Sequence, residues 1–464
     1  MKIILMNVVY LFCSNILIKI LTALSTFIVA RYLGAEEYGE LSVLIALSTV
    51  LSSLLDLGLI NTTIREGTKK NSKIDLVISS FFNIRIILFC FLTVVFLLYA
   101  FCLYNGNVLA LLLITIPTLI GQLLQGVAKV YYQIKEEMKN IAIINIIIGI
   151  LTPIFIFVAI YLKLSLNFIA FSYGLTSLLA GIICIVIVQK KYKYTVIINK
   201  SILVGIHLFT INALLYTIIP QLGPIILEKI LSLQDVGYFS AAYRIPSYLY
   251  VIPGIVATAF YPRLFKLYNQ GEFAKHSNLS KIQIKIMTTI TSIVTMPFIF
   301  FSTIFITILF GEEWLVLENY VPVLCLVVIL QSFNYPLADY LTTKGHQDKR
   351  LIALSISFFI GVTSYIYLGV KYGLSGVIYA PIMLEVSYLL ILSYFTKSHR
   401  LFVVNRLIKL SVMFGILNYL QNIIDYNAII EMVTCLVVSI FIMFILDLKY
   451  ILQLGRGFKL IYRK

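Results

Sequence analysis

Six charged side chains interrupt stretches of this chain that are otherwise almost entirely apolar. They are three carboxylic acids and three bases: Asp56, Asp339, Glu385, Lys19, Arg85 and Arg244. An ionisable residue inside a bilayer is costly, and it usually faces a water-filled or protein-lined cavity. The expected chemistry is therefore the binding of charged groups and of protons or small cations.

The three bases are candidate substrate-binding residues. Lys19 lies near the middle of its apolar run, too deep to reach either surface easily. With Arg244 it could hold an anionic group such as a pyrophosphate, because arginine offers a fork of donors and lysine a point charge. Arg85 is the third candidate, but its long stem could instead carry it to the cytoplasmic interface beyond Asp75. Arg244 lies close to Gly237 and could similarly sit at the outer interface.

The three acids are candidate ion-coupling residues. Glu385 is the most central and the first choice for a site that binds H⁺ or Na⁺. Its alternative role is to pair with a polar neighbour in the helix bundle. Asp56 lies late in its apolar run and could instead cap a kink near Gly58. Asp339 lies near the inner end of its run, where an ion pair with Lys344 is the alternative.

The composition places all these residues in a membrane. The chain has 464 residues, 61% of them hydrophobic and only 12% charged, whereas a soluble domain is nearer half apolar and a quarter charged. The apolar runs are continuous and longer than the alternating strands of about ten residues in a membrane barrel. An all-α integral membrane protein is therefore expected. The net charge of +16 is attributed to basic cytoplasmic loops and not to nucleic-acid binding.

A transmembrane helix needs roughly 20 apolar residues, and the apolar runs of the chain predict about fourteen such helices. They cover residues 4–30, 39–62, 77–103, 108–130, 141–162, 167–189, 203–227, 238–262, 282–310, 319–342, 351–370, 374–396, 405–424 and 428–448. With both termini in the cytoplasm, 29 of the 36 lysines and arginines, Lys129 among them, are assigned to the inner side and four to the outer side, as the distribution of basic loop residues requires. The stretch RYLGAEEYGE, residues 31–40, then becomes an outer hairpin.

A weak internal repeat divides the predicted spans into two halves. RYLGAEEYGELS overlies KILSLQDVGYFS, so that Gly39 pairs with Gly237, and Arg65 pairs with Arg263 at the same offset. Six spans are an even number, so the halves would share one orientation, as in a known transporter architecture. We expect two six-helix lobes, residues 1–200 and 201–400, around a central cavity. Residues 401–464 would add two helices and a basic cytoplasmic tail. The alternative is that any two helical hairpins look alike.

Two segments resemble a known family. STFIVARYLGAEEYGELSVLIALSTVLSSLLDLGLINTTIRE resembles the first two spans of the polysaccharide flippases, the Wzx-type O-antigen transporters. DVGYFSAAYRIPSYLYVIPGIVATAFYPRLFKLYNQGE resembles their seventh and eighth spans. The pattern RYLG-x-x-x-YG followed by DLGL carries most of this likeness, which extends to about residue 396. The last two spans depart from it, since some members have twelve spans and others fourteen. The superfamily also includes multidrug exporters and the lipid II flippase.

The resemblance implies a flippase of the bacterial inner membrane. Its substrate would be an undecaprenyl-pyrophosphate-linked oligosaccharide, a repeat unit of an O-antigen or capsule, moved by alternating access during lipopolysaccharide or polysaccharide biosynthesis. Basic residues of the first and eighth spans, here Lys19 and Arg244, would bind the headgroup. The partners would be this lipid-linked oligosaccharide, membrane lipids and the polysaccharide polymerase machinery.

Two other functions remain open at this point. One is a cation-coupled multidrug exporter of the same superfamily. The other is a membrane polysaccharide polymerase, which would need a sizeable external loop that the predicted spans do not leave. No metal site is expected, because the six cysteines form no CxxC pair. A transporter without an enzymatic reaction and without a cofactor, apart from a coupling ion, is favoured.

Overall fold

The computed structural model describes residues 2–69, 72–103, 113–135, 137–189, 191–204, 206–423 and 430–442. These residues form helices and short connections, with no strand among them, which confirms the all-α class. Within them, nine helices are long and apolar enough to cross a membrane. The predicted count of fourteen therefore stays a prediction. The chain divides into two compact units, Met1–Ala241 and Ala242–Lys464.

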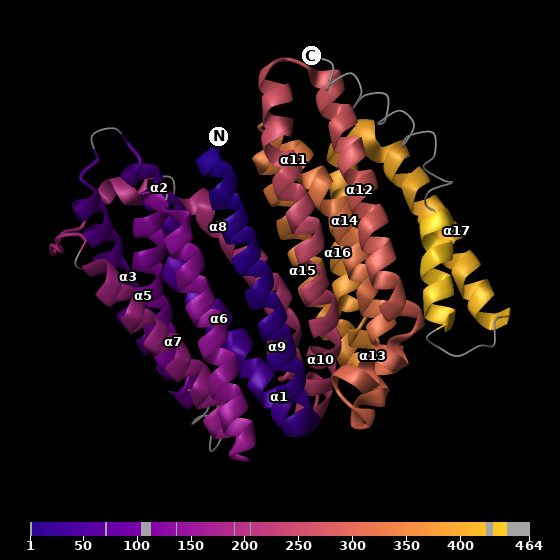
Figure 1. Ribbon diagram of the computed structural model, residues 1–464, viewed down its shortest axis with the longest axis horizontal. Coiled ribbons are helices and arrows are strands. Elements are labelled where there is room, and N and C mark those ends of the chain that lie inside the picture. The colour runs from indigo at the N-terminus through magenta and orange to yellow at the C-terminus, as the bar shows by residue number, and fades with distance from the viewer. Residues whose placement is uncertain are drawn as a thin grey trace. The chain divides into compact units, whose positions relative to one another are not determined.

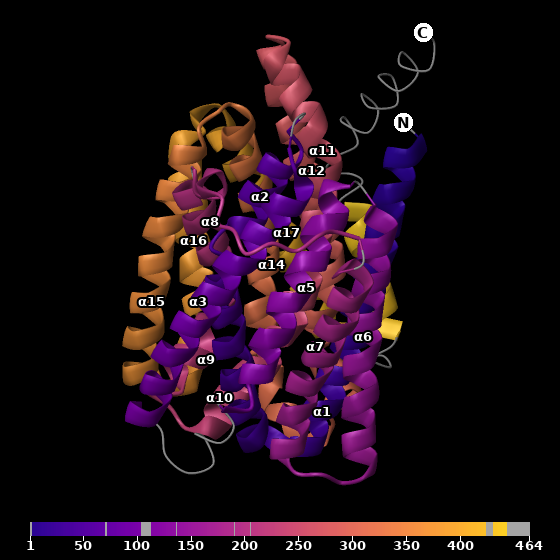
Figure 2. The same cartoon turned by 90° about the vertical axis from the view of Figure 1, so that its left-hand side faces the viewer.

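The first unit is built from long helices that pack directly on one another (Figure 1). Its elements are α1 (Lys2–Asp56), α2 (Leu59–Gly67), α3 (Ile74–Leu103), α5 (Ile116–Ile134), α6 (Met138–Tyr161), α7 (Leu166–Gln189), η1 (Lys200–Leu203), α8 (Ile206–Ile218), η2 (Ile219–Gln221), α9 (Leu222–Leu227) and the start of α10 (Leu233–Leu249). α5 packs against α7, and α1 against α6, as the turned view also shows (Figure 2). α8 and α9 contact α1 in this unit.

The first two predicted spans are joined more tightly than the sequence suggests. α1 continues through RYLGAEEYGE, and its one non-helical residue is Gly34, with φ 73° and ψ 179°. Glycine adopts such a positive φ without the clash that a Cβ would cause. The predicted ten-residue hairpin is thus wrong in its extent, because a single glycine makes the break.

Gly39 and Gly237, which are paired by the internal repeat, lie close together, and each contacts the backbone of the helical turn that holds the other. A Cβ on Gly39 would overlap the backbone carbonyl of Leu233, and a Cβ on Gly237 would overlap the backbone carbonyl of Ala35. Ala35 and Leu233 are themselves a pair at the same offset in the sequence. This reciprocity is what a local two-fold relation between the two segments produces.

The second unit has α14 at its centre. It comprises the rest of α10, α11 (Val251–Asn269), α12 (Phe273–Phe300), α13 (Ser302–Leu309), η3 (Glu312–Asn319), α14 (Val321–Thr343), α15 (Gln347–Val377), α16 (Ala380–Phe395), η4 (Lys397–His399) and α17 (Arg400–Ile423), followed by a shorter apolar helix, Ile430–Ile442. α14 packs against α11, α12, α15 and α16. The end of the predicted span 428–448 and the predicted basic tail after it lie outside the described residues.

Large apolar side chains cover much of the outer surface of both units. Phe91 and Leu98 of α3 are 63% and 62% exposed, and Phe359 and Val370 of α15 are 66% and 71% exposed. A water-soluble protein would bury side chains of this size, whereas lipid tails solvate them. The exposed apolar surface, together with the length of the helices, confirms the prediction of a multi-pass membrane protein.

Candidate functional site

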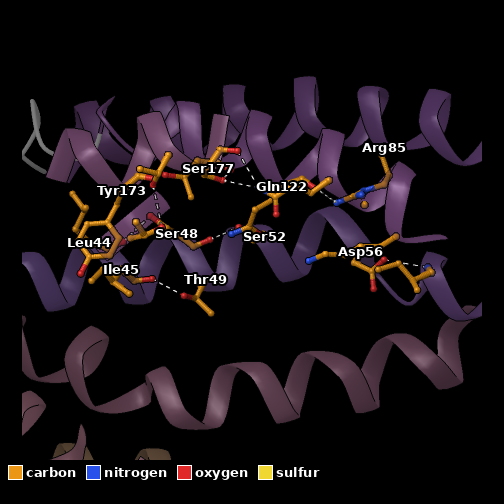
Figure 3. Close-up of a pocket in the computed structure, with 17 residues that line it drawn as sticks. Leu44, Ile45, Ser48, Thr49, Ser52, Asp56, Arg85, Gln122, Tyr173 and Ser177 are labelled. Carbon is orange, nitrogen blue, oxygen red and sulfur yellow. Dashed lines mark hydrogen bonds between the residues drawn. The ribbon is translucent and has the colours of Figure 1, made fainter. Parts of the chain in front are cut away.

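A polar pocket of about 490 Å³ lies inside the first unit. Of the 17 residues that line it, all but four carry a hydroxyl, amide or charged group (Figure 3). The lining residues are Leu44, Ile45, Ser48, Thr49, Ser52, Asp56, Ile60, Arg85, Thr118, Gln122, Gln125, Gly126, Lys129, Thr152, Tyr173, Thr176 and Ser177. They come from α1, α2, α3, α5, α6 and α7, so that six separate helices must pack to form the pocket.

The sequence places these polar residues at helical spacing inside apolar helices. In α5, Gln122, Gln125 and Lys129 fall on one face, because residues three and four apart lie above one another on a helix. In α1, Ser48 and Ser52 repeat the same spacing and continue to Asp56. Each stripe turns toward the pocket, while the apolar remainder of each helix packs or faces lipid.

Arg85 lies at one end of the pocket and is buried, with 3% of its surface exposed. Its Nη1 donates to the carbonyl of Leu123 at 3.1 Å and its Nη2 to the carbonyl of Gln122 at 3.3 Å. The guanidinium reaches the backbone of α5 because Gly126 has no side chain, and a Cβ there would overlap Nη1. Its Nε is buried and has no partner among the described residues. The alternative prediction, that Arg85 extends to the interface, is therefore wrong.

Asp56 lies toward the same end of the pocket as Arg85 (Figure 3). Its Oδ1 accepts a hydrogen bond from the Ile60 backbone N–H at 3.1 Å. Between these two residues α1 ends and α2 begins, through Leu57 and Gly58 at positive φ values of 41° and 72°. Asp56 thus caps the kink at Gly58, as its alternative role predicted. It forms no ion pair with Arg85 in the described part of the chain, although the two charges interact at longer range.

Lys129 is a functional candidate that the sequence analysis missed. The sequence analysis places it with the basic residues of the inner side, but it lies inside α5 and lines the pocket. It makes no hydrogen bond to another described residue. Its spacing from Gln122 and Gln125 was the signal that could have found it. With Arg85 it gives the pocket two positive charges against the one negative charge of Asp56.

The remaining polar groups offer both donors and acceptors. Gln125 Nε2 donates to the carbonyl of Ser177 at 3.0 Å, which ties α5 to α7. Ser48 and Ser52 donate their hydroxyl hydrogens to carbonyls of their own helix, so their oxygens remain available as acceptors. The pocket can therefore bind an anionic ligand that is rich in hydroxyl groups. In the described residues there is no group of three or more His, Cys, Asp or Glu side chains that could hold a metal ion.

The second unit holds the other two predicted acids. Glu385 is 7% exposed and accepts from Gln331 Nε2 at 2.8 Å and from Asn334 Nδ2 at 2.6 Å. Asp339 is 6% exposed and accepts from Gln283 Nε2 at 2.9 Å. The alternative of an ion pair between Asp339 and Lys344 is not observed in the described part of the chain.

Lys19 and Arg244 belong to different units. Lys19 is exposed on the first unit, and Arg244 is half-buried at the start of the second. Their joint binding of one anionic group stays a prediction. Of the six charged residues singled out in the sequence, the structure brings Arg85 and Asp56 to one pocket.

Comparison with known families gives one match. A family model described as "Polysaccharide biosynthesis protein" matches residues 4–268, which is more than half of the chain and includes every residue of the pocket. A comparison with curated proteins finds no match.

Solved structures with the same fold include a lipid flippase and multidrug transporters. The lipid II flippase MurJ in an inward closed conformation is 18% identical, with a TM-score of 0.73, covering 96% of this chain and 100% of that one. An inward-facing multidrug resistance MATE family transporter of the MOP superfamily is 16% identical, with a TM-score of 0.67, covering 81% and 93%. The MATE multidrug transporter DinF-BH is 14% identical, with a TM-score of 0.61, covering 86% and 96%.

Proposed function

Because the chain belongs to the polysaccharide biosynthesis protein family and has the fold of a lipid II flippase, we propose that it is a flippase for lipid-linked oligosaccharides. Its substrate would be an undecaprenyl-pyrophosphate-linked repeat unit of an O-antigen or capsule. The protein would move this substrate across the bacterial cytoplasmic membrane by alternating access. No reaction would be catalysed, because transfer of the headgroup between the two sides requires no bond to break.

The polar pocket of the first unit supports this proposal most directly. Burying Arg85 and Lys129 in a membrane helix bundle costs several kcal/mol per charge unless they are compensated. Asp56 compensates one positive charge, which leaves the pocket with a net charge of +1. A phosphate group or an acidic sugar would neutralise the remainder, and sugar hydroxyls would bond to the serines, threonines and glutamines.

Arg85 is the residue of the pocket that is best held in place for such a role. Its guanidinium is fixed by two carbonyls of α5 and lies over the Phe81 ring, 5.2 Å from the ring centroid. An arginine held in this way loses little entropy when it binds an oxygen of a ligand, because its conformation is already set. Its Nε, which has no described partner, is one of the donors left for that contact.

A second candidate function is the export of small drugs, which the MATE transporters of the same fold favour. Pockets for drug-sized molecules are lined predominantly by hydrophobic and aromatic side chains. In the pocket of the first unit, Tyr173 is the one aromatic residue. This lining favours a glycan over a drug.

A deletion strain tests the function. We expect it to lose its surface glycan and to accumulate the undecaprenyl-linked oligosaccharide, with unchanged sensitivity to cationic drugs. Complementation with Arg85→Met or Lys129→Met, which keep the aliphatic stem and remove the charge, should lower the surface glycan about tenfold or more. That figure follows from the loss of one charge-assisted hydrogen bond, about 1.5–3 kcal/mol.

The matched control is Lys135→Met, because Lys135 caps the same helix but is exposed and does not line the pocket. It should restore the glycan fully. Normal glycan in the deletion strain, without a second gene for the same step, would refute the flippase function. Normal glycan combined with drug sensitivity would support the exporter instead.

A further inference from the structure

The chain between α7 and α8 runs along the side of another helix. Residues 193–199 are extended, and the short helix η1 follows them (Figure 2). We call residues 191–204 the connector. By sequence it lies almost entirely between the predicted spans 167–189 and 203–227. Its contacts place it beside α3, within the first turns of the predicted span 77–103.

Two serines of α3 hold the connector by its backbone. Ser79 Oγ accepts from the N–H of Thr195 at 3.1 Å, and Ser80 Oγ accepts from the N–H of Asn199 at 2.8 Å. Both serines are fully buried. A helix rises 1.5 Å per residue, so they lie about 3–5 Å inside the edge of the predicted span. The connector is therefore bound beside the span itself.

Asn83, one turn further along α3, uses its whole side-chain amide for the same contact. Its Nδ2 donates to the carbonyls of Thr195 at 3.2 Å and Ile197 at 2.9 Å, and its Oδ1 accepts from the Tyr194 hydroxyl at 2.6 Å. Asn83 lies about 9 Å inside the edge of the predicted span. Non-helical backbone is tolerated at such a depth only where its polar groups find partners, and α3 supplies them.

Both ends of the connector are anchored in the core of the first unit. Tyr192 and Ile202 are buried among apolar side chains of α2, α3 and α5. The Nζ of Lys191 lies over the Tyr132 ring of α5, 4.9 Å from the ring centroid. The connector thus has a defined face toward the protein and a defined face away from it.

The outer face of the connector is apolar. Val196 is 87% exposed, and Ile198 and Val204 are 49% and 64% exposed. Exposure of such side chains to water is unfavourable, whereas lipid tails solvate them. α3 carries further exposed apolar side chains from Ile87 to Leu98. The connector therefore extends the lipid-facing surface of that helix.

Lysines flank this apolar face. The connector contains Lys191, Lys193 and Lys200 and no acidic residue. Lys193 and Lys200 are exposed and form no ion pair with another described residue. Lysine stems lie along apolar surface while their charged ends reach the headgroups, and anionic headgroups attract them. Interfacial segments with this pattern bury their apolar face about 5–10 Å into the boundary between headgroups and acyl chains, which matches the depth of the contacts with α3.

We propose that the connector is a binding surface for anionic phospholipids. Val196 and Ile198 lie among the acyl chains, and Lys193 and Lys200 bind phosphate headgroups of the leaflet at this end of α3. The serines and the asparagine of α3 satisfy the connector backbone, so that it remains extended at this depth. The proposal is independent of the proposed function, because the contact requires no transported substrate.

Tryptophan fluorescence of the full chain in lipid nanodiscs tests the depth, because Trp314 is the single tryptophan of the sequence. In a Trp314→Phe background, Val196→Trp places a fluorophore on the outer face of the connector. Phospholipids with brominated acyl chains should quench it as strongly as they quench Phe91→Trp, at a 63% exposed position of α3. Iodide in the buffer should not. If Trp314→Phe fails to fold, the native chain supplies the background to subtract, since Trp314 is 1% exposed.

The aqueous control is Gln270→Trp, at an exposed position between α11 and α12. It should show the opposite pattern, with quenching by iodide and none by brominated chains. The pair of controls calibrates both quenchers on the same protein.

The headgroup preference has its own readout. Quenching of Val196→Trp by brominated phosphatidylglycerol and by brominated phosphatidylcholine gives the ratio of their binding constants. We expect a preference of about fivefold for the anionic lipid, the effect of one lysine near the membrane surface. The double variant Lys193→Gln/Lys200→Gln should reduce the ratio to about one. Lys163→Gln, at an exposed position between α6 and α7, should leave it unchanged.

Three results would overturn the proposal. Quenching of Val196→Trp by iodide alone would place the connector in water. Quenching by neither agent would show that protein covers it, either a second copy of the chain or another partner. Equal quenching by the two brominated lipids, with both lysines present, would reject the binding of anionic headgroups.

Discussion

The reciprocal contact between Gly39 and Gly237 predicts that a single methyl group at either position destabilises the protein. In Gly39→Ala the new Cβ would overlap the carbonyl of Leu233 and approach the Gly237 nitrogen. Both obstacles are backbone atoms, which no change of rotamer can move. We therefore take the upper end of the cost of overpacking, about 3 kcal/mol. Alanine in a helix recovers about 1 kcal/mol relative to glycine, so the net loss is about 2 kcal/mol.

Gly254 of α11 provides the matched control. It is also a helical glycine, but a Cβ built there has no neighbour within 4 Å. Gly254→Ala should therefore gain about 1 kcal/mol from helix propensity alone. The two variants should differ by about 3 kcal/mol, although each adds the same methyl group to a helix.

The double variant Gly39→Ala/Gly237→Ala tests the reciprocity itself. Once one methyl group has separated the two backbones, the second finds the space already opened, so the losses should not add. We expect a total loss of about 2–3 kcal/mol and not the additive value of about 4 kcal/mol. The assay is unfolding of the purified protein in mixed micelles, titrated with dodecyl sulfate and followed by circular dichroism. Full additivity, or a Gly39→Ala variant as stable as Gly254→Ala, would show that the two helices do not meet in this way.

Two further substitutions separate packing from charge. Arg406→Met should lower the free energy of unfolding by about 2 kcal/mol, because the buried guanidinium of Arg406 in α17 donates through Nε to Thr288 Oγ1 of α12 at 2.9 Å. The control is Arg400→Met, at an exposed position of the same helix. Equal stability of the two variants would contradict the prediction. Asp56→Ala and Asp56→Asn both remove the negative charge, but Asp56→Asn keeps an acceptor oxygen for the Ile60 N–H, so Asp56→Ala should be about 1 kcal/mol less stable than Asp56→Asn through loss of the cap. The same unfolding assay measures both, and identical losses in the two Asp56 variants would exclude the cap.

The candidate site could be predicted only in part. Sequence analysis found Arg85 and Asp56, because a charge stands out in an apolar run. It did not find Lys129, since a lysine near the end of a predicted span counts equally well as part of a basic loop. The serines, threonines and glutamines of the pocket were also missed, because each is ordinary in a membrane helix until several helices turn the same kind of group toward one space.

By itself the sequence determined the membrane class and the extents of most helices. The predicted spans 77–103, 167–189 and 319–342 correspond closely to Ile74–Leu103, Leu166–Gln189 and Val321–Thr343. Both results follow from local properties: transfer of apolar side chains into lipid and the satisfaction of backbone hydrogen bonds within one helix. Neither depends on which helices become neighbours.

Only the tertiary structure decided which polar groups meet. Arg85 reaches the carbonyls of α5 because Gly126 of that helix leaves room for it. Glu385 finds Gln331 and Asn334 because α16 packs on α14 at the depth of those amides. Such pairings depend on the rotation and the relative height of packed helices. These are set by the summed contacts of many side chains, and no single stretch of sequence contains them.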